Sequence, residues 1–274
     1  VYRKIANLIL LLVASNLSAQ VTYYDAAEFQ LLGKATAATT ERYVRLPDSL
    51  EHVSRLPLWQ LSRNSSGMAV RFRSNSTQVA VKWESLVNFH MDHMTDVAVK
   101  GLDLYCLEGK NWYFVNSARP IGKSTESSLI SGMEAKEREF MIYLPLYDGL
   151  VSLSIGIDAG ASINQPAIES PVREKPVVFY GTSILQGGCA SRPGMAHTNI
   201  ISRRLNRECI NLGFSGNAFL DLGVAQVMAG VDAGVFVLDF VPNVTVEQMN
   251  ERMEKFYRIP VSYTHLRAHE TCAD

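Results

Sequence analysis

Three short apolar segments in the second half of the chain each end in a polar or glycine-containing turn. The segments span residues 176–184, 209–217 and 235–243. The turns that follow the apolar residues carry a serine, Ser183, a glycine, Gly216, and a carboxamide, Asn243. A serine hydroxyl held at such a turn can act as a nucleophile that forms a covalent intermediate. Ser183 is therefore the candidate nucleophile.

The elements that must position these residues are parallel strands and the helices between them. A run of four apolar residues is too short for a helix and indicates a strand buried on both faces. Helix-length segments separate the three strands, which predicts the order β-α-β-α-β. Ligands of open parallel sheets lie beyond the carboxyl ends of the strands, so we expect the three residues to gather at one edge. The alternative is a serine that ends its strand and caps the following helix.

Four sequence blocks, taken in order, resemble the SGNH (GDSL-type) hydrolase superfamily. The blocks are residues 101–105, residues 181–184, residues 211–217 with Gly216, and Asn243. Thr182 departs from the usual Gly-Asp-Ser of the nucleophile block. This variant resembles the subgroup in which a β-rich domain with a Gly-x-Asp-Leu-Tyr motif precedes the hydrolase domain, and residues 101–105, Gly-Leu-Asp-Leu-Tyr, supply that motif.

The resemblance implies a serine ester hydrolase that needs neither a metal nor an organic cofactor. Ser183 would attack the ester carbonyl to give an acyl-enzyme. The backbone N–H groups of Ser183 and Gly216 and the side-chain amide of Asn243 would donate to the oxyanion. The superfamily takes its base and acid from a late Asp-x-x-His block, and this sequence shows no such block. Asp239 ends the third strand, but without a histidine it has no assignable role.

The last residues, 261–274, change abruptly in character. They back-translate into a sequence that resembles the adapter of transposon-made sequencing libraries, so we exclude them from the fold prediction as a non-native tail. His265 and His269 lie in this tail and are not taken as the missing base. We expect residues 177–260 to be only the first part of the hydrolase domain and the chain to be inactive towards simple esters.

The first 19 residues have the pattern of a secretory signal peptide. Arg3 and Lys4 precede an apolar run of about ten residues, and Leu-Ser-Ala at 17–19 stands before Gln20. The run is too short to span a bilayer, and no cysteine stands at the cut site to carry a lipid anchor. We therefore expect a secreted or periplasmic protein without a membrane span; an N-terminal core helix is the alternative.

Residues 20–163 alternate short strands and turns, which predicts a β-sandwich of jelly-roll type. Residues 68–73 and 78–83 alternate apolar and polar side chains around a polar turn, which predicts a hairpin. Further strands are expected at 96–105, 112–115, 139–144 and 151–157. Residues 164–176 contain three prolines and are typical of a linker. The predicted fold class is all-β plus α/β: a sandwich followed by a truncated three-layer, flavodoxin-like domain of SGNH type.

Composition and spacing disfavour several other kinds of site. The net charge is −1, so nothing draws the protein to nucleic acid or to an acidic membrane. Residues 181–188 have neither the spacing nor the lysine of a phosphate-binding loop. His90 and His93 flank a carboxylate but lack a third ligand for a metal, and the other interpretation is that their loop packs over the catalytic edge. Cys189 has no neighbouring base, which favours a structural thiol.

The predicted function is deacylation of an acylated carbohydrate by an exported serine esterase, with the substrate inferred by analogy. The partner would then be a small-molecule or glycan ester. A non-catalytic carbohydrate-binding sandwich is an alternative, which exposed aromatic side chains at Trp59, Trp83, Trp112 or Tyr113 would favour if they form a flat platform. An O-acyltransferase, in which a sugar hydroxyl replaces water as acceptor, is another.

Overall fold

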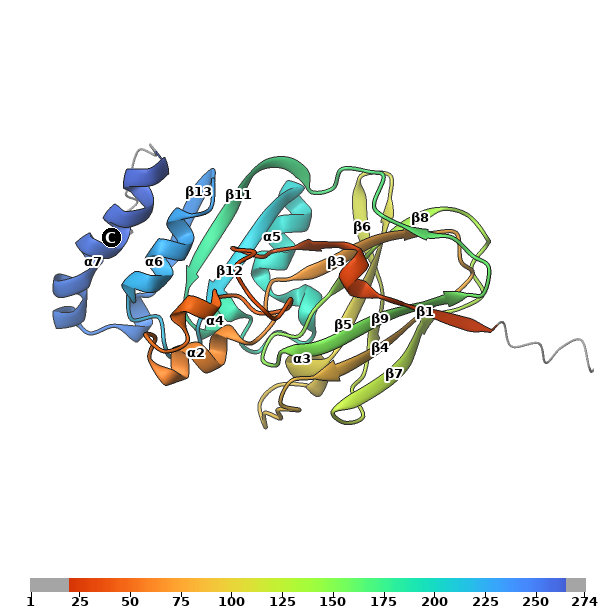
Figure 1. Ribbon diagram of the computed structural model, residues 1–274, viewed down its shortest axis with the longest axis horizontal. Helices are drawn as coiled ribbons and strands as arrows, with labels where there is room; N and C mark the ends of the chain where they lie inside the picture. The colour runs from red at the N-terminus through yellow and green to blue at the C-terminus, as the bar shows by residue number, and fades with distance from the viewer. Residues whose placement is uncertain (1–19, 265–274) are drawn as a thin grey trace, which may run out of the picture.

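The computed structural model describes residues 20–264, which form a β-sandwich and a parallel sheet with helices on both faces (Figure 1). The signal peptide expected at residues 1–19 and most of the expected tail, residues 265–274, lie outside the described residues. Within residues 20–264, no helix combines the length and the apolar character that a membrane crossing requires. The predicted fold class, a β-sandwich followed by an α/β domain, is confirmed.

Two antiparallel sheets face each other in the sandwich. One has the order β1-β9-β4-β7, formed by Val21–Asp25, Leu150–Asp158, Val79–Ser85 and Ser124–Ile130. The other has the order β10-β3-β8-β5-β6, formed by Ile163–Asn164, Ala69–Ser74, Arg138–Tyr143, Leu102–Glu108 and Asn111–Ala118; β2, Gln30–Leu32, also pairs with β3. Phe72, Val81 and Phe140 are fully buried in the shared core. Burial of these alternating apolar side chains holds the two sheets together.

The prediction that residues 68–73 and 78–83 form a hairpin is wrong. β3 pairs with β8, whereas β4 pairs with β7 and β9, so the two strands lie in opposite sheets. The turn between them is held by Asp158, whose carboxylate accepts hydrogen bonds from Ser76 and Thr77. An alternating pattern fits either sheet, because both sheets bury one face against the same core.

The strand expected at residues 96–105 begins only at Leu102. Asp96–Lys100 forms a short helix, α3, instead. Thr95 precedes this helix, and its side-chain oxygen accepts a hydrogen bond from the N–H of Ala98 at 3.2 Å. A threonine cap of this kind satisfies a backbone N–H at the start of a helix, which stabilises the turn against an extended conformation.

The α/β domain has the sheet order β12-β11-β13, and its strands are parallel. These strands are Arg207–Gly213, Val172–Gly181 and Val235–Asp239, and the helices are α4 (Ser183–Gln186), α5 (His197–Leu205), α6 (Leu222–Ala229) and α7 (Val246–Thr264). α4 and α5 pack on the sheet face that carries Val177 and Phe179. α6 and α7 pack on the opposite face, which carries Val178 and Tyr180 (Figure 1). This arrangement matches the order predicted from the apolar runs.

Part of the N-terminal region packs on the α/β domain instead of the sandwich. Short 3-10 turns lie at Ala26–Glu28 and Asp48–Leu50, and helix α2 spans Leu56–Ser62. Leu46, Leu58 and Trp59 are buried in the same core cluster as Tyr180 of β11. Figure 1 shows α2 beside the α/β domain. The expected sandwich domain, residues 20–163, therefore also supplies one wall of the hydrolase core.

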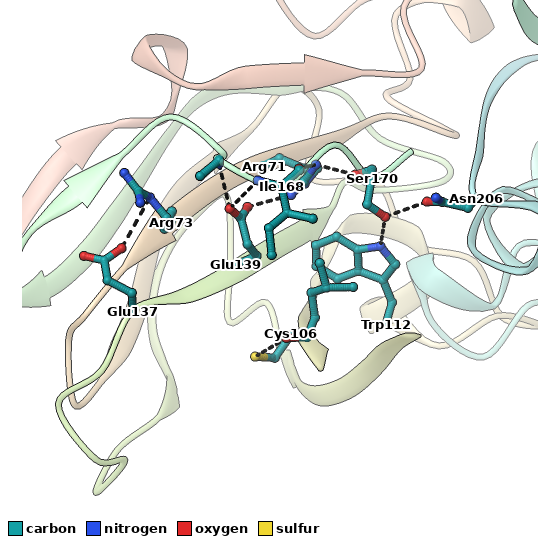
Figure 2. Close-up of polar contacts among 11 residues, drawn as sticks. Arg71, Arg73, Cys106, Trp112, Glu137, Glu139, Ile168, Ser170 and Asn206 are labelled. Carbon is teal, nitrogen blue, oxygen red and sulfur yellow. Dashed lines mark hydrogen bonds and ion pairs between the residues drawn. The ribbon is translucent and has the colours of Figure 1, made fainter. Parts of the chain in front are cut away.

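The segment expected as a linker, residues 164–176, is fixed by a buried ion pair, and β11 begins within it at Val172. Arg71 of β3 and Glu139 of β8 pair at 2.6 Å between Nη2 and Oε2, with both side chains almost completely buried. Arg71 also donates to the carbonyl oxygen of Ser170 (Figure 2). Buried charges are stable only when they are paired and hydrogen-bonded, and the carbonyl oxygen of Ser170 supplies one of the acceptors that Arg71 needs.

Ser170 extends this network to the α/β domain. Its hydroxyl accepts a hydrogen bond from Trp112 Nε1 at 2.8 Å and donates to Asn206 Oδ1 at 2.6 Å (Figure 2). Asn206 ends α5 in a left-handed conformation, with φ of 49°. The linker is therefore hydrogen-bonded to both domains.

Candidate active site

Ser183 lies at the end of β11 as the first residue of α4. In the sheet, Gly181 pairs with Gly213 of β12 and with Asp239 of β13, so all three strands end at the same edge. A Cβ at Gly181 would lie 2.4 Å from the carbonyl oxygen of Asp239, so only glycine fits this approach. Ser183 is half-buried, and its N–H, at the first position of a helix, has no partner within the helix.

Gly216 lies on a tight turn three residues after the end of β12. Its φ is +63°, a left-handed conformation that favours glycine, and a Cβ there would meet no atom within 4 Å. Within residues 20–264, no hydrogen bond occupies the N–H of Gly216. The turn is tied to the nucleophile helix, because Gln186 Oε1 accepts a hydrogen bond from the N–H of Ser215 at 2.9 Å. Gly216 thus has an N–H without a hydrogen-bond partner among the described residues, on a turn that is bonded to α4.

Asn243 lies in the 3-10 turn Val241–Asn243 that follows β13. Its Oδ1 accepts a hydrogen bond from the N–H of Ala218 at 3.2 Å, which links this turn to the Gly216 turn. Because Oδ1 is used in this way, the Nδ2 donors remain, and no protein group among the described residues accepts from them. The carboxamide is therefore held through its oxygen, and its two N–H donors are available to a ligand.

The sequence prediction missed Tyr147, a residue of the sandwich domain beneath the nucleophile. Its hydroxyl donates to the carbonyl oxygen of Ser183 at 3.2 Å. Burial raises the pKa of Tyr147, with Ser215 and Arg45 acting in the opposite direction, so the phenol stays protonated at neutral pH. Gln186 Nε2 likewise donates to the carbonyl oxygen of Leu146 at 3.1 Å. Residues of the sandwich domain are thus hydrogen-bonded to the helix that begins with the nucleophile.

Arg45 is a second residue that the prediction missed, and it fixes the start of the Gly216 turn. It is 1% exposed and donates to the carbonyl oxygens of Gly213 at 2.6 Å and Asn211 at 3.3 Å. Its guanidinium also lies 4.7 Å from the ring centroid of Phe214. Burial lowers the pKa of Arg45 to about 9, so the side chain remains charged at pH 7. Nothing in the local sequence around Arg45 signals these contacts, which span more than 160 residues.

Within the described residues, no histidine is hydrogen-bonded to the hydroxyl of Ser183. His197 is half-buried at the start of α5, with its ring edge towards Phe179 at 6.5 Å between centroids. Burial lowers the pKa of His197, and Asp239 partly offsets this effect. His197 is therefore neutral at pH 7, but its contacts in the structure are not those of a base for Ser183.

His90 and His93 are exposed and pair with carboxylates on their own loop. His90 Nδ1 lies 2.7 Å from Asp96 Oδ1, and His93 Nδ1 lies 2.9 Å from Asp92 Oδ1. Among residues 20–264, no group of three or more histidine, cysteine, aspartate or glutamate side chains is placed to hold a metal ion. The same loop packs beside the nucleophile segment, since Met91 joins the apolar cluster that contains Tyr147.

The cysteines of the described chain are free thiols. Cys106 and Cys209 are buried, and burial raises the pKa of Cys209 to about 12. Cys189 is exposed and lies at a φ of 60°. Within residues 20–264, no hydrogen bond joins its thiol to a base, and its exposure differs from the buried position of a structural thiol.

Sequence comparisons assign both parts of the chain to one kind of enzyme. Residues 21–163 match the N-terminal GxDLY domain of SGNH hydrolase-type esterases, and residues 174–264 match the GDSL-like lipase/acylhydrolase family. No curated protein matches the chain. These matches define the class as GDSL-like lipases and acylhydrolases, which is a class of esterases. Within that class, the chain belongs to the GDSL-like (SGNH) hydrolase family, in the group with a GxDLY domain.

Solved structures give the same fold. The crystal structure described as a GDSL-like lipase from Bacteroides ovatus ATCC 8483 is 37% identical, with a TM-score of 0.84 over 89% of this chain and 71% of that chain. The salicylyl-acyltransferase SsfX3 of a tetracycline biosynthetic pathway is 15% identical, with a TM-score of 0.67 over 90% and 68%. A family two carbohydrate esterase from Cellvibrio japonicus is 8% identical, with a TM-score of 0.55 over 90% and 76%. At these low identities, the acyltransferase and the carbohydrate esterase show only that this chain has the same fold.

Proposed function

We propose that the protein hydrolyses carboxylic esters through an acyl-enzyme on Ser183. The hydroxyl oxygen attacks the carbonyl carbon and gives its proton to a base, while the carbonyl electrons move onto oxygen. The N–H groups of Ser183 and Gly216 and Nδ2 of Asn243 donate to this oxyanion. The oxyanion collapses, the bond to the alcohol breaks, and the base returns its proton to the alcohol. Water then releases the acid by the same steps.

One observation carries the proposal. The pairing of Gly181 with Gly213 and Asp239 ends three strands at one edge, and each following turn supplies one of the required groups. The carboxamide of Asn243 is held with its oxygen turned to Ala218, which leaves donors for the substrate. A hydroxyl with preorganised donors beside it is what ester hydrolysis requires.

We propose that the base that accepts the proton of Ser183 lies outside residues 20–264. A serine hydroxyl reacts slowly unless a base accepts its proton, and within these residues no histidine is bonded to Ser183. A histidine oriented by an acid, as in the resembled superfamily, would supply this function. The described chain then provides the nucleophile and the oxyanion donors.

The proposed substrate is an acylated carbohydrate met after export. The start of the sequence supports export, and one structural neighbour is described as a carbohydrate esterase. Transfer of the acyl group to a sugar hydroxyl is the second candidate, because another neighbour of the same fold is described as an acyltransferase. Product analysis with a sugar acceptor distinguishes the two: free acid indicates hydrolysis, and an acylated sugar indicates transfer.

A purely sugar-binding sandwich is less favoured. Trp59 and Trp83 are 8% and 2% exposed, so they cannot form a flat platform for a sugar. Trp112 is half-buried with its Nε1 bonded to Ser170, and Tyr113 is the exposed member of the set. The aromatic side chains named from the sequence therefore serve mainly as packing groups.

Fluorophosphonate labelling tests the proposal on the chain itself. The serine oxygen attacks phosphorus, fluoride leaves, and the proton passes to a base, so labelling reports both nucleophile and base. We expect slow labelling of Ser183, a rate that rises with added imidazole, and no labelling of the Ser183→Ala variant. Peptide mapping by mass spectrometry identifies the modified residue.

Two outcomes would contradict parts of the proposal. Modification of another residue would exclude Ser183 as nucleophile. Fast labelling of Ser183 that imidazole does not change would show that the chain already supplies its base, and the external histidine would be wrong.

A further inference from the structure

The residues of the Gly-x-Asp-Leu-Tyr motif point alternately into the sandwich and towards the hydrolase domain. Leu102 and Leu104 are fully buried in the sandwich core. Asp103 and Tyr105, on the opposite face of β5, are 0% and 3% exposed and contact the α/β domain. At Gly101, a Cβ would lie 2.7 Å from the carbonyl oxygen of Ala118, so glycine is required where β5 begins.

Asp103 holds the segment that follows the nucleophile helix. Its Oδ2 accepts hydrogen bonds from the N–H of Gly194 at 2.8 Å and from Arg192 Nη1 at 3.2 Å. Its Oδ1 accepts from the hydroxyl of Ser117 at 2.7 Å. A fully buried carboxylate is stable here because all its partners are donors, one of them charged.

Tyr105 completes the contact. Its hydroxyl accepts a hydrogen bond from Arg192 Nη1 at 2.8 Å, and the guanidinium of Arg203 lies 4.4 Å from its ring centroid. Arg203, on α5, donates to the carbonyl oxygen of Gly194 at 2.8 Å. A Cβ at Gly194 would lie 2.4 Å from the Tyr105 hydroxyl, so this approach requires glycine. Figure 1 shows α5 lying between the sandwich and the parallel sheet.

The segment held in this way, residues 187–196, begins at the backbone of the nucleophile. The N–H of Gly188 donates to the carbonyl oxygen of Ser183 at 2.7 Å, and that of Gly187 to the same oxygen at 3.1 Å. A second sandwich contact, from the Thr95 hydroxyl to the carbonyl oxygen of Ser191 at 2.7 Å, fixes the middle of the segment. The sandwich domain is thus hydrogen-bonded to the middle and to the end of the 187–196 segment, and the start of this segment is hydrogen-bonded to Ser183.

We infer that Asp103 and Tyr105 are positioning residues for Ser183, acting through the 187–196 segment. This inference rests on the proposed role of Ser183 as nucleophile. The sandwich domain is then a part of the catalytic scaffold, because a displacement of about 1 Å at a reacting group lowers rates by up to about 10²-fold. Tyr147 of the same domain also helps to position Ser183, because its hydroxyl donates to the carbonyl oxygen of Ser183.

The test compares Asp103→Asn with Asp158→Asn. Asp158 is a carboxylate of the same domain that holds the turn at Ser76 and Thr77 and makes no hydrogen bond to the α/β domain among the described residues. Fluorophosphonate labelling with imidazole gives the limiting rate and the apparent affinity, and hydrogen exchange gives the protection of residues 187–196. We expect Asp103→Asn to lower the limiting rate about 10-fold or more, with little change in affinity, and to speed exchange in that segment.

The control separates positioning from stability. Asp158→Asn is expected to lower the melting temperature without changing either the labelling rate or the exchange of residues 187–196. Equal effects of both variants on the labelling rate, or unchanged exchange in Asp103→Asn, would overturn the inference. Arg192→Ala, which removes a partly exposed partner of Asp103, gives the same test if Asp103→Asn does not fold. Absence of Ser183 labelling in the unsubstituted chain would count against the proposed function, while exchange still tests the contact.

Discussion

Replacing Asn243 with alanine is expected to slow phosphonylation of Ser183 by about 10²–10³-fold, the usual cost of one lost oxyanion donor. The reason is geometric. Its Oδ1 is held by the N–H of Ala218, so Nδ2 is fixed as a donor before the substrate arrives. The expected loss lies in the limiting rate of labelling, because the donor interacts most strongly with the charged intermediate.

Asn250→Ala is the matched control for this prediction. Asn250 is exposed on α7 and lies seven residues further along the chain. Its replacement should leave both the labelling rate and the stability unchanged. A rate for Asn243→Ala within about threefold of the unsubstituted chain would remove Asn243 from the oxyanion site, given the 10²–10³-fold effect expected for a donor.

Replacing Arg45 with methionine is expected to destabilise the protein by on the order of 2–4 kcal/mol. Methionine fills much of the same volume but donates nothing, so the carbonyl oxygens of Asn64, Leu61 and Gly213 lose their buried donors. Each unsatisfied buried group costs about 1–3 kcal/mol, which relief of the desolvated charge offsets only in part. Urea unfolding, followed by fluorescence, measures the change in free energy of unfolding.

Arg258→Met serves as the control for Arg45. Arg258 is exposed on α7 and pairs with Glu254 four residues earlier, and solvent screens an exposed pair of this kind so that it adds little to stability. Its loss should leave the free energy of unfolding nearly unchanged. If Arg45→Met were equally mild, the carbonyl oxygens around it would have to find other donors, and the proposed role of Arg45 in fixing the Gly216 turn would be wrong.

The parallel sheet was predictable from sequence because its central strand, β11, carries an apolar run that is buried on both faces. Residues 177–180 are uniformly apolar, and the structure places this run and the two later ones next to each other in the order β12-β11-β13. Parallel strands joined by helices end at the same edge, so the positions of Ser183, Gly216 and Asn243 followed from the order of elements. Their catalytic roles remain predictions.

The sandwich was predictable only in class. The alternating pattern that suggested a hairpin of residues 68–73 and 78–83 is satisfied equally by two strands in opposite sheets, and sequence periodicity does not distinguish these pairings. Likewise, the apolar residues at 97–99 fit a strand, whereas the cap provided by Thr95 favours the helix. The linker prolines gave no sign of the buried Arg71–Glu139 pair that fixes this segment.

The residues that support the site could not be predicted from the sequence, for a different reason. Tyr147 and Arg45 act on residues 36 and 168 positions away, through contacts that depend on how the two domains pack. The Gly-x-Asp-Leu-Tyr motif could be recognised, but its contact with Arg192 and Gly194 required the structure. Sequence patterns thus located the chemical groups, whereas the residues that hold them in place became visible only in three dimensions.

The most direct test of the central claim is a crystal structure of the chain after fluorophosphonate labelling. We predict phosphorus bonded to Ser183 Oγ, with the phosphoryl oxygen within hydrogen-bond distance of the Gly216 N–H and of Asn243 Nδ2. A phosphoryl oxygen directed into solvent, away from both donors, or a label on any other residue would contradict the assignment of this edge as the active site.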